Sequence, residues 1–495
     1  MYYQRKRQTF KEMDKIKRQR QKQSIRDIVG WIYSDLPWFS EEEANVATLQ
    51  RNELLAALSG WVSYSFQRSK PHSGPLSPGC SICGGGGWGC NYINSLCTRH
   101  CFYCPQDRSM KEECESYTDG ITFKNPAEHV SFLKIFQIRG VGFSGGEPLL
   151  VLDRLLSHIN AIRHEFGNSL YLWMYTNGDG VDRSTLKRLQ DAGLNEIRFD
   201  LSARKYDLTP VVLSKEYIPT VTVEIPAIPE DFDLLKNMVG EMESAGVNFL
   251  NLHQLLSTEY NYKALSRRNY HFLHQPTIPV FESEICALKL LVFAREHGVQ
   301  LPINYCCSAY KDRFQCGGER TRLSRVVLKG FEEITNAGYI RSFLVKDSRD
   351  KIESMVRQIE ETHGSADRWQ CDERKTEITI HGDLLSYVDW SSANVTIMYL
   401  QPVVGLKKTD DGIIEGNLVP KNSVVYNECG WSQVGIESWR KLYKEKMNPK
   451  DVLKLFLQNY PASGKDTVSK LQKEMGELKN IANWEELESD LPEIF

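Results

Sequence analysis

The chain of 495 residues lacks four features that would assign it to a broad class of protein. No apolar run approaches the ~18 residues that a membrane-spanning helix needs, and the charged N-terminus lacks the apolar core of a secretion signal. A net charge of -3 gives no reason to expect nucleic acid or an acidic lipid surface as a partner of the whole chain. There is also no internal repeat. These absences predict a cytoplasmic protein that does not enter a membrane.

The composition is that of an ordinary soluble globular protein, with 41% hydrophobic and 25% charged residues. Its length predicts two to four domains, although an α/β barrel can use about 200–250 residues as one. The 13 cysteines are more than such a protein needs for packing. In a cytoplasmic protein they are expected to be thiols and metal ligands, not a disulfide framework.

The predicted organisation begins with residues 1–79, a helical region followed by a linker. Residues 1–27 are rich in Lys and Arg, which favours a solvated helix; the alternative is a basic arm that touches an acidic partner or RNA. Residues 28–66 carry apolar residues at helical spacing and predict a small helical subdomain. Residues 67–79 are rich in proline and serine and read as a linker.

Residues 80–335 are predicted to be one α/β domain, because short β-branched runs alternate there with amphipathic helices. Such alternation predicts a parallel sheet, either a barrel or a doubly wound sheet, with functional residues at the carboxyl ends of its strands. The predicted strands are residues 88–95, 140–148, 169–178, 196–202, 220–228, 248–255 and 300–307. The predicted helices are residues 125–136, 152–166, 183–193, 208–216, 231–246 and 282–298.

Residues 336–495 read differently and predict a separate α+β domain. Antiparallel strands are expected in residues 375–388 and 393–406, and surface helices in residues 448–460 and 469–488.

The most informative motif is the string LCTRHCFYC, in which Cys97, Cys101 and Cys104 follow the first predicted strand with the spacing C-x3-C-x2-C. Three thiolates on one loop can hold three irons of a four-iron cluster and leave the fourth iron open to a ligand that is not protein. Tyr103 precedes the last cysteine, where an aromatic ring can cover the cluster or a nucleotide beside it.

The second predicted strand ends in SGGEP, which contains Ser144, Gly145, Gly146 and Glu147. The two glycines allow a ligand to approach the backbone closely, their N–H groups can bind a carboxylate, and Glu147 can bind an ammonium group. This strand end therefore suits the amino-acid portion of a ligand that carries both groups.

Together, the cysteine motif and this strand end resemble the radical S-adenosylmethionine (radical SAM) superfamily over roughly residues 88–307. The resemblance implies a partial (β/α)6-type barrel, here with an N-terminal helical extension and a C-terminal α+β domain. It implies a [4Fe-4S] cluster on the three cysteines and S-adenosylmethionine on the open iron. Gly145, Gly146 and Glu147 would hold the methionine end.

Other strand ends match the family more loosely. Asn177 follows the third strand, and Asp200 and Ser202 follow the fourth, where family members bind ribose or the methionine carboxylate. EIPAI lacks the glycine pattern of the fifth strand, which leaves the adenine contact of that strand unsupported. Asn251 and His253, at the end of the sixth strand, are candidate neighbours of adenine. A turn or a strand cap is the alternative for each of these residues.

Within the superfamily the chain is most similar to the group related to the pyruvate formate-lyase activating enzyme. The strings that carry this likeness are TNGDG, GLNEIRFD, EIPAIP, NFLNLHQL and NYCCSAYKDRFQ. The best-known relative takes hydrogen from a glycine of a partner enzyme. That activity is not carried over here, because this chain adds domains on both sides.

A second cysteine set predicts an auxiliary metal site. Cys80, Cys83 and Cys90 are spaced C-x2-C-x6-C, and a C-x2-C turn among glycines aims two thiolates at one metal. Cys306 is the leading candidate for the fourth ligand, ahead of Cys307 and Cys316. The alternatives are a second iron–sulfur cluster, zinc, or unliganded thiols. The isolated Cys114, Cys286, Cys371 and Cys429 are expected to be ordinary buried cysteines.

The leading hypothesis is an oxidoreductase that cleaves S-adenosylmethionine reductively to a 5′-deoxyadenosyl radical and takes hydrogen from a substrate. A flavodoxin or ferredoxin would be the reductant, and the added domains suit a peptide or protein substrate. The alternatives are a radical SAM methyltransferase and a non-catalytic zinc or iron–sulfur scaffold. The basic residues Lys311, Arg313, Arg320 and Arg322 are expected on a solvated helix, with an anionic substrate group as the alternative contact.

Overall fold

A computed structural model describes residues 30, 32–106, 116–275, 277–363, 366–389, 392–400, 407–408, 414–415, 426–429, 490–492 and 494. The chain forms two compact units, Met1–Cys316 with Ser489–Phe495, and Gly317–Glu488. The predicted helices at 1–27, 448–460 and 469–488 and the side chains of Cys114 and Cys429 lie outside the described residues. The predicted three-part division at residues 79 and 335 stays a prediction.

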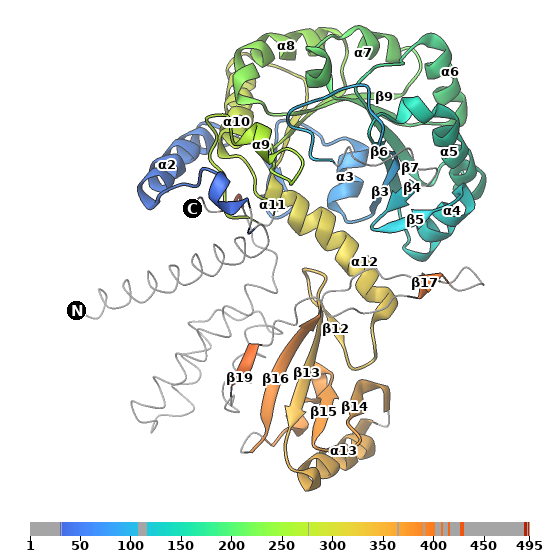
Figure 1. Ribbon diagram of the computed structural model, residues 1–495, viewed down its shortest axis with the longest axis vertical. Helices are drawn as coiled ribbons and strands as arrows, with labels where there is room; N and C mark the ends of the chain where they lie inside the picture. The colour runs from blue at the N-terminus through green and yellow to red at the C-terminus, as the bar shows by residue number, and fades with distance from the viewer. Residues whose placement is uncertain are drawn as a thin grey trace. The chain divides into compact units, whose positions relative to one another are not determined.

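The first unit is built on an eleven-stranded sheet whose central strands are all parallel (Figure 1). These strands lie side by side in the order in which they occur in the chain. Their carboxyl ends therefore share one edge, where the loops that follow them meet. The strands are β3 (Trp88–Asn94), β6 (Gly140–Gly145), β7 (Tyr171–Thr176), β8 (Glu196–Phe199), β9 (Thr220–Pro226), β10 (Phe249–His253) and β11 (Ile303–Cys306).

Antiparallel strands extend the sheet at both ends, and the sheet does not close into a full barrel. Beyond β3 lie β4 (Ser116–Thr118) and β5 (Ile121–Phe123), and beyond β11 lies the hairpin of β2 (Lys70–His72) and β1 (Ser63–Ser65). The predicted partial (β/α)6-type barrel is confirmed, with β11 as an additional parallel strand.

Helices connect the parallel strands and surround the sheet in Figure 1. Their ends follow the sequence: Asp182 caps the N-terminus of one helix through the N–H of Thr185, and Gly193 ends the same helix at φ 85°. Residues such as Leu155 and Ile159 are fully buried against the sheet. The helices are α4 (Pro126–Ile135), α5 (Leu152–Phe166), α6 (Arg183–Ala192), α7 (Thr209–Ser214), α8 (Phe232–Ser244), α9 (Tyr262–Leu265) and α10 (Phe281–Glu296).

The N-terminal segments belong to the first unit as well. Helix α2 (Glu41–Ala57) begins at a capping box between Ser40 and Glu43 and packs on α10, and a short helix α3 (Pro78–Gly84) precedes β3. Residues 67–79 differ from the predicted linker, because β2 pairs with β11 and all three of its residues are buried. Proline at position 71 is tolerated there since β2 pairs with β11 at His72 and not at Pro71.

The second unit contains an antiparallel sheet with a helix packed on it. Its strands are β12 (Glu333–Ile334), β13 (Ile340–Lys346), β14 (Trp369–Cys371), β15 (Glu377–Ile380), β16 (Asn394–Leu400) and β19 (Tyr426–Cys429), with a separate pair β17 (Lys407–Lys408) and β18 (Ile414–Glu415). Its helices are α12 (Gly317–Val327) and α13 (Arg349–His363). The structure has antiparallel strands within both predicted segments, as β15 and β16, whereas residues 401–406 lie outside the described residues. After Ile380 the chain turns into a 3-10 helix, and α13 is absent from the prediction.

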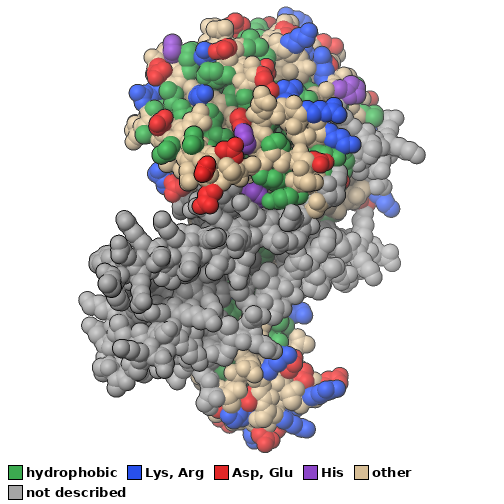
Figure 2. Space-filling view, turned by 60° about the vertical axis from the view of Figure 1, so that its left-hand side comes forward, with side chains coloured by type: hydrophobic (Ala, Val, Ile, Leu, Met, Phe, Trp, Pro, Cys, Tyr) green, Lys and Arg blue, Asp and Glu red, His purple; other side chains and the backbone are tan. Residues whose placement is uncertain are grey.

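No helix of the described residues is both long and apolar enough to cross a membrane. Figure 2 shows acidic and basic side chains interspersed over the described part of the face in view, in keeping with the small net charge.

Two histidines are buried against each other between α4, α5 and the sheet. The Nδ1 atoms of His129 and His158 lie 3.1 Å apart, and Asn91 and Ser116 contact the pair. Burial lowers the pKa of His158 to about 4 and holds the pKa of His129 well below its usual value. Both imidazoles are therefore neutral in the folded protein at neutral pH.

This pair predicts a loss of stability in mild acid. Below the ordinary histidine pKa of about 6.5, the unfolded chain takes up protons that the folded chain excludes, so burial of His158 destabilises the fold by about 2 kcal/mol at pH 5. We expect His158→Asn to lessen the fall in unfolding temperature between pH 7.5 and pH 5, measured by circular dichroism. His164→Asn, an exposed position on the same helix, is the control. Equal pH dependence in both variants would contradict the assignment.

Candidate functional site

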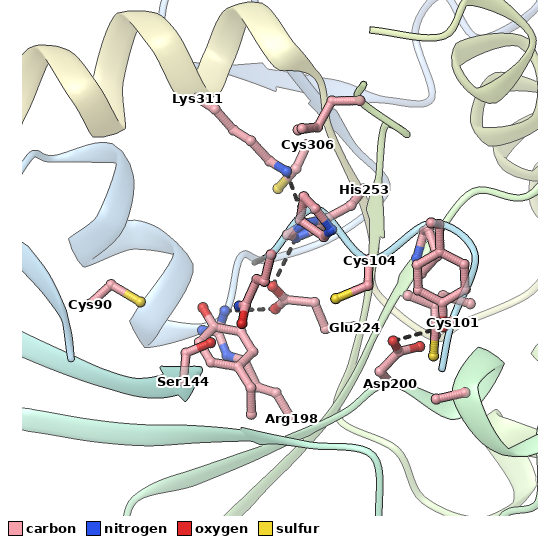
Figure 3. Close-up of a pocket in the computed structure, with 18 of the residues that line it drawn as sticks. Cys90, Cys101, Cys104, Ser144, Arg198, Asp200, Glu224, His253, Cys306 and Lys311 are labelled. Atoms are coloured by element: carbon pink, nitrogen blue, oxygen red, sulfur yellow. Dashed lines mark hydrogen bonds and ion pairs between the residues drawn. The ribbon is translucent and has the colours of Figure 1, made fainter. Parts of the chain in front are cut away.

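A cavity of about 370 Å³ opens at the carboxyl edge of the parallel strands. Both cysteine sets reach it, although they come from different elements of the fold. Figure 3 shows members of the two sets around the same space, with a group of charged side chains between them. The thiols that line the cavity are those of Cys80, Cys83, Cys90, Cys97, Cys101, Cys104 and Cys306.

The loop that carries the C-x3-C-x2-C motif is tied to the end of β7. Arg99 forms an ion pair with Asp179 through two of its nitrogens, with Nε 2.7 Å from Oδ2, and Thr98 donates to the same carboxylate. These hydrogen bonds lower the pKa of Asp179, so it is a carboxylate at neutral pH. Asn177 adds a bond of 2.9 Å from Nδ2 to the Thr98 hydroxyl and lies 3.7 Å from the Cys97 sulfur.

The other end of the loop is tied to β8 and to the segment after β10. The hydroxyl of Tyr103 donates to Asp200 at 2.9 Å and lies 2.6 Å from the Ser202 hydroxyl. The backbone carbonyl of Tyr103 accepts from Asn261 at 3.0 Å. Tyr103 and Asp200 line the cavity, but Ser202 is not among its lining residues. The predicted site residues that follow β8, Asp200 and Ser202, thus lie against the cysteine loop. There their side-chain oxygens form hydrogen bonds with the Tyr103 hydroxyl.

The glycines after β6 accommodate protein backbone. A Cβ at Gly145 would collide with the carbonyl oxygen of Asn94, and one at Gly146 with that of Leu96. The N–H groups of Gly146 and Glu147 donate to these same carbonyls, at 2.8 and 2.6 Å. This corrects the expectation for Gly146, because its N–H already donates to a backbone carbonyl and cannot also bind a carboxylate. Ser144, Gly145 and Gly146 nevertheless line the cavity, and their carbonyls are the groups suited to an ammonium ligand.

Glu147 is buried, with 1% of the residue exposed, and is not among the residues that line the cavity. Its carboxylate accepts from the Thr176 hydroxyl at 2.9 Å, the Asn177 N–H at 2.8 Å and the Leu149 N–H at 3.1 Å. Burial raises the pKa of Glu147 to about 7 against the effect of these donors. In this geometry Glu147 fixes the end of β7, which in turn holds the cysteine loop.

The inner wall of the cavity carries a network of buried charges. Arg198 donates to Glu224 at 2.8 Å and to Glu196 at 2.9 Å, and the side chains of these three residues are at most 7% exposed. His253 lies 2.8 Å from Glu224 and 3.2 Å from the ammonium of Lys311. Burial alone would raise the pKa of Glu224, but Arg198 and His253 hold it well below its usual range.

Cys306 lies beside this network at the end of β11. Lys70, from β2, donates to its sulfur. Burial alone would raise the pKa of Cys306, but Lys70 and His253 bring it down to about 6. Burial raises the pKa of Cys83 to about 12, so the thiols of this set differ strongly in acidity.

The other described cysteines of the first unit are not among the residues that line the cavity. Cys307 donates to the carbonyl of Ser69 at 3.1 Å and accepts from the N–H of Tyr310, so it caps a turn. Cys286 bonds to the carbonyl of Ile228 from within α10. Among the candidates for a fourth ligand, Cys306 lines the cavity, whereas Cys307 and Cys316 do not.

Two sequence expectations need correction. Lys311 and Arg313 do not lie on a solvated helix: Lys311 lines the cavity from a π-helical turn, Lys311–Cys316, and buried Arg313 donates to the carbonyl of Asp490. Arg322 is buried as well. The sequence prediction also omitted Lys70, Arg198 and Glu224. Arg198 and Glu224 are charged residues within otherwise apolar parallel strands. Charges at such positions could have been taken to indicate a polar interior.

Comparison with known proteins decides the family. The sequence model of the radical SAM superfamily matches residues 91–224. A protein of Methanocaldococcus jannaschii named as a glycyl-radical enzyme activating enzyme is 30% identical over 298 residues, which cover 58% of this chain and 78% of its own. The chain belongs to the radical SAM superfamily. It is therefore an enzyme, and the alternative of a non-catalytic scaffold is wrong.

Solved radical SAM structures are less similar to this chain. Streptococcus suis SuiB bound to S-adenosylmethionine has a TM-score of 0.31 and 11% identity over 44% of this chain and 49% of its own. The structure of anSMEcpe with bound AdoMet and a peptide has a TM-score of 0.33 and 16% identity over 51% and 72%. The chain thus spans about half of SuiB, and the fold described above follows from the strand order.

The donor set of this radical SAM enzyme fits the cofactors that its family implies, a [4Fe-4S] cluster and S-adenosylmethionine. Cys97, Cys101 and Cys104 stand on one tied loop and all line the cavity. Three thiols leave one iron of such a cluster without a cysteine ligand. The carbonyl groups and the amide of Asn177 nearby are suited to a polar ligand of that iron.

The ion pair between Arg99 and Asp179 predicts how firmly the cluster is held. Asp179→Asn keeps the shape of the side chain but removes its charge. A bidentate ion pair of this kind contributes about 1 kcal/mol, so we expect the variant to lose iron to a chelator about fivefold faster. Iron release followed by visible absorbance measures this rate. Asp153→Asn, which removes a surface partner of Arg188, is the matched control. Equal release rates in the two variants would show that the ion pair does not hold the loop.

Proposed function

We propose that this enzyme reductively cleaves S-adenosylmethionine and uses the resulting 5′-deoxyadenosyl radical to take a hydrogen atom from a substrate in the cavity. The observation that carries the proposal is the position of Cys97, Cys101 and Cys104 on a tied loop at the carboxyl edge of a partial barrel. When bound, the cluster supplies the electron, which a flavodoxin- or ferredoxin-type donor would deliver.

In this proposal the chain positions the cofactors and excludes water from them. The residues that line the cavity are retained as contacts with S-adenosylmethionine: Tyr103, Ser144, Gly145, Gly146, Asn177, Asp200 and His253. Glu147 and Ser202 act through their neighbours, since Glu147 orders the end of β7 and Ser202 supports Tyr103. Holding two reactants in a fixed geometry supplies much of the rate of such reactions.

A peptide or protein is the proposed class of substrate. The support is the likeness to the Methanocaldococcus jannaschii protein, whose name assigns it to enzymes that activate a glycyl-radical enzyme. The proposal also includes a metal on the second cysteine set, zinc or an iron–sulfur cluster, because those thiols line the same cavity.

Cys101→Ala tests the radical chemistry directly. The reconstituted variant, incubated anaerobically with dithionite and S-adenosylmethionine, is expected to form less than about 1% of the 5′-deoxyadenosine formed by the unchanged protein, since a cluster with two thiolates is not retained. Cys286→Ala, a buried cysteine on the outer helix α10, is expected to retain the activity. Undiminished cleavage in Cys101→Ala would sink the proposal.

Deuterium transfer tests the substrate class. An extract of source cells grown in deuterated medium is separated by ultrafiltration, and each fraction is incubated with enzyme and unlabelled S-adenosylmethionine. Hydrogen abstraction from a protein predicts deuterium in 5′-deoxyadenosine with the retained fraction, measured by mass spectrometry. Deuterium from the filtrate alone would assign a small-molecule substrate instead.

A further inference from the structure

We propose that Cys80, Cys83, Cys90 and Cys306 bind a second iron–sulfur cluster and that Lys70 tunes its reduction potential. The inference specifies the metal group of the second cysteine set, which the proposed function leaves as zinc or an iron–sulfur cluster. It rests on the proposed function for the presence of a substrate in the same cavity. It does not depend on the cleavage of S-adenosylmethionine.

The four thiols come from three elements that the fold brings to one wall of the cavity. Cys80 and Cys83 lie on α3, Cys90 lies on β3, and Cys306 ends β11. Helix α3 is placed by its cap, in which the hydroxyl of Ser77 accepts from the N–H of Cys80 at 3.1 Å. Cys80, Cys83 and Cys306 are at most 7% exposed, so whatever they hold is shielded from bulk water.

Buried polar groups donate hydrogen bonds to these sulfurs. The amide of Asn251 lies 3.3 Å from the Cys80 sulfur, and the amide of Gln315 lies 2.8 Å from the Cys83 sulfur. The hydroxyl of Tyr310 also donates to Cys83, at 3.5 Å. A neutral thiol is a weak acceptor. Several donors aimed at sulfur match the environment of cluster thiolates, where such bonds set the reduction potential.

Lys70 adds a positive charge to the same wall. It is 0% exposed, its ammonium contacts the Cys306 sulfur, and it lies 4.2 Å above the ring of Tyr310. No carboxylate within the described residues forms an ion pair with it. Burying an ammonium is costly unless a negative group lies beside it. In this structure that group is the Cys306 sulfur, which is negative as a thiolate, and a metal centre would hold all four thiols of the set as thiolates.

The turn before Lys70 carries strain that supports this role. Phe66, Gln67 and Arg68 have φ angles of 52°, 50° and 62°, a left-handed conformation that costs side-chain-bearing residues energy. The turn directs β2 into the sheet and places the ring of Phe66 against Tyr310 and Phe314. The strained residues thus position Lys70 and the aromatic wall beside the thiols.

The spacing of the thiols favours a cluster over a single zinc ion. Sulfurs around one tetrahedral zinc lie about 4 Å from each other, because each Zn–S bond is about 2.3 Å. Among the described residues, the group of three ligand side chains that comes within 4.8 Å is Glu333, His381 and Asp383 in the second unit. No three thiols among the described residues all come that close to one another, and the four line one cavity, an arrangement that favours a multinuclear group.

Metal content tests the proposal on the full chain. The anaerobically reconstituted protein is expected to hold about eight irons and eight sulfides, the content of two four-iron clusters. Changing Cys97, Cys101 and Cys104 together to Ser is expected to leave about four, and Cys306→Ser is also expected to leave about four. Cys307→Ser, whose sulfur caps a turn beside Ser69, is the matched control and is expected to keep eight. About four irons in the unchanged protein, or zinc in their place, would overturn the inference.

The reduction potential tests Lys70 in the triple Ser variant, which isolates the second cluster. Reduction adds negative charge, which a nearby ammonium stabilises, so Lys70→Met is expected to shift the midpoint to a more negative potential with unchanged iron content. Lys134→Met, which removes a surface ion pair with Glu165, is the control. An unchanged midpoint in Lys70→Met would remove Lys70 from the site.

These outcomes separate the two proposals. Eight irons without 5′-deoxyadenosine would leave the second cluster standing and contradict the proposed reaction. Four irons with 5′-deoxyadenosine would contradict the second cluster alone.

Discussion

The candidate site depends on the attachment of one short loop to the carboxyl edge of a parallel sheet. The loop that carries Cys97, Cys101 and Cys104 has no regular secondary structure, so its shape comes from hydrogen bonds to the ends of its neighbours. Backbone bonds join it to β6, the Arg99–Asp179 pair joins it to β7, and Tyr103 joins it to β8. Because these strands are adjacent, a loop attached to all of them is held as firmly as the sheet itself.

Buried charge sets the character of the rest of the cavity. Arg198, Glu224 and His253 form a connected network in which each charge has a partner, and such networks are stable only when every member is satisfied. The network lies between the two cysteine sets in Figure 3. It makes the space between them polar and fixed, which suits a site that must hold a charged cofactor beside a substrate.

The strand order and the cysteine loop could be predicted from the sequence because they depend on local patterns. Alternating apolar runs and amphipathic helices predict the parallel sheet, and the spacing of Cys97, Cys101 and Cys104 predicts a shared ligand. The roles of Glu147 and Lys70 could not be predicted in this way. Burial of Glu147 depends on β7, and the position of Lys70 depends on a strand pairing across more than two hundred residues of sequence. Long-range contacts of this kind leave no local periodicity.

The pairing of β2 with β11 has a consequence for how the protein matures. Lys70 reaches the second cysteine set only when this edge of the sheet has formed, and the strained turn before it offers no independent stability. If that set carries a metal centre, its assembly and the closure of this edge are thermodynamically linked, because binding to the folded form stabilises that form. Binding of the metal centre would then complete the fold, and the stability of the β1–β2 hairpin would depend on whether the metal centre is bound.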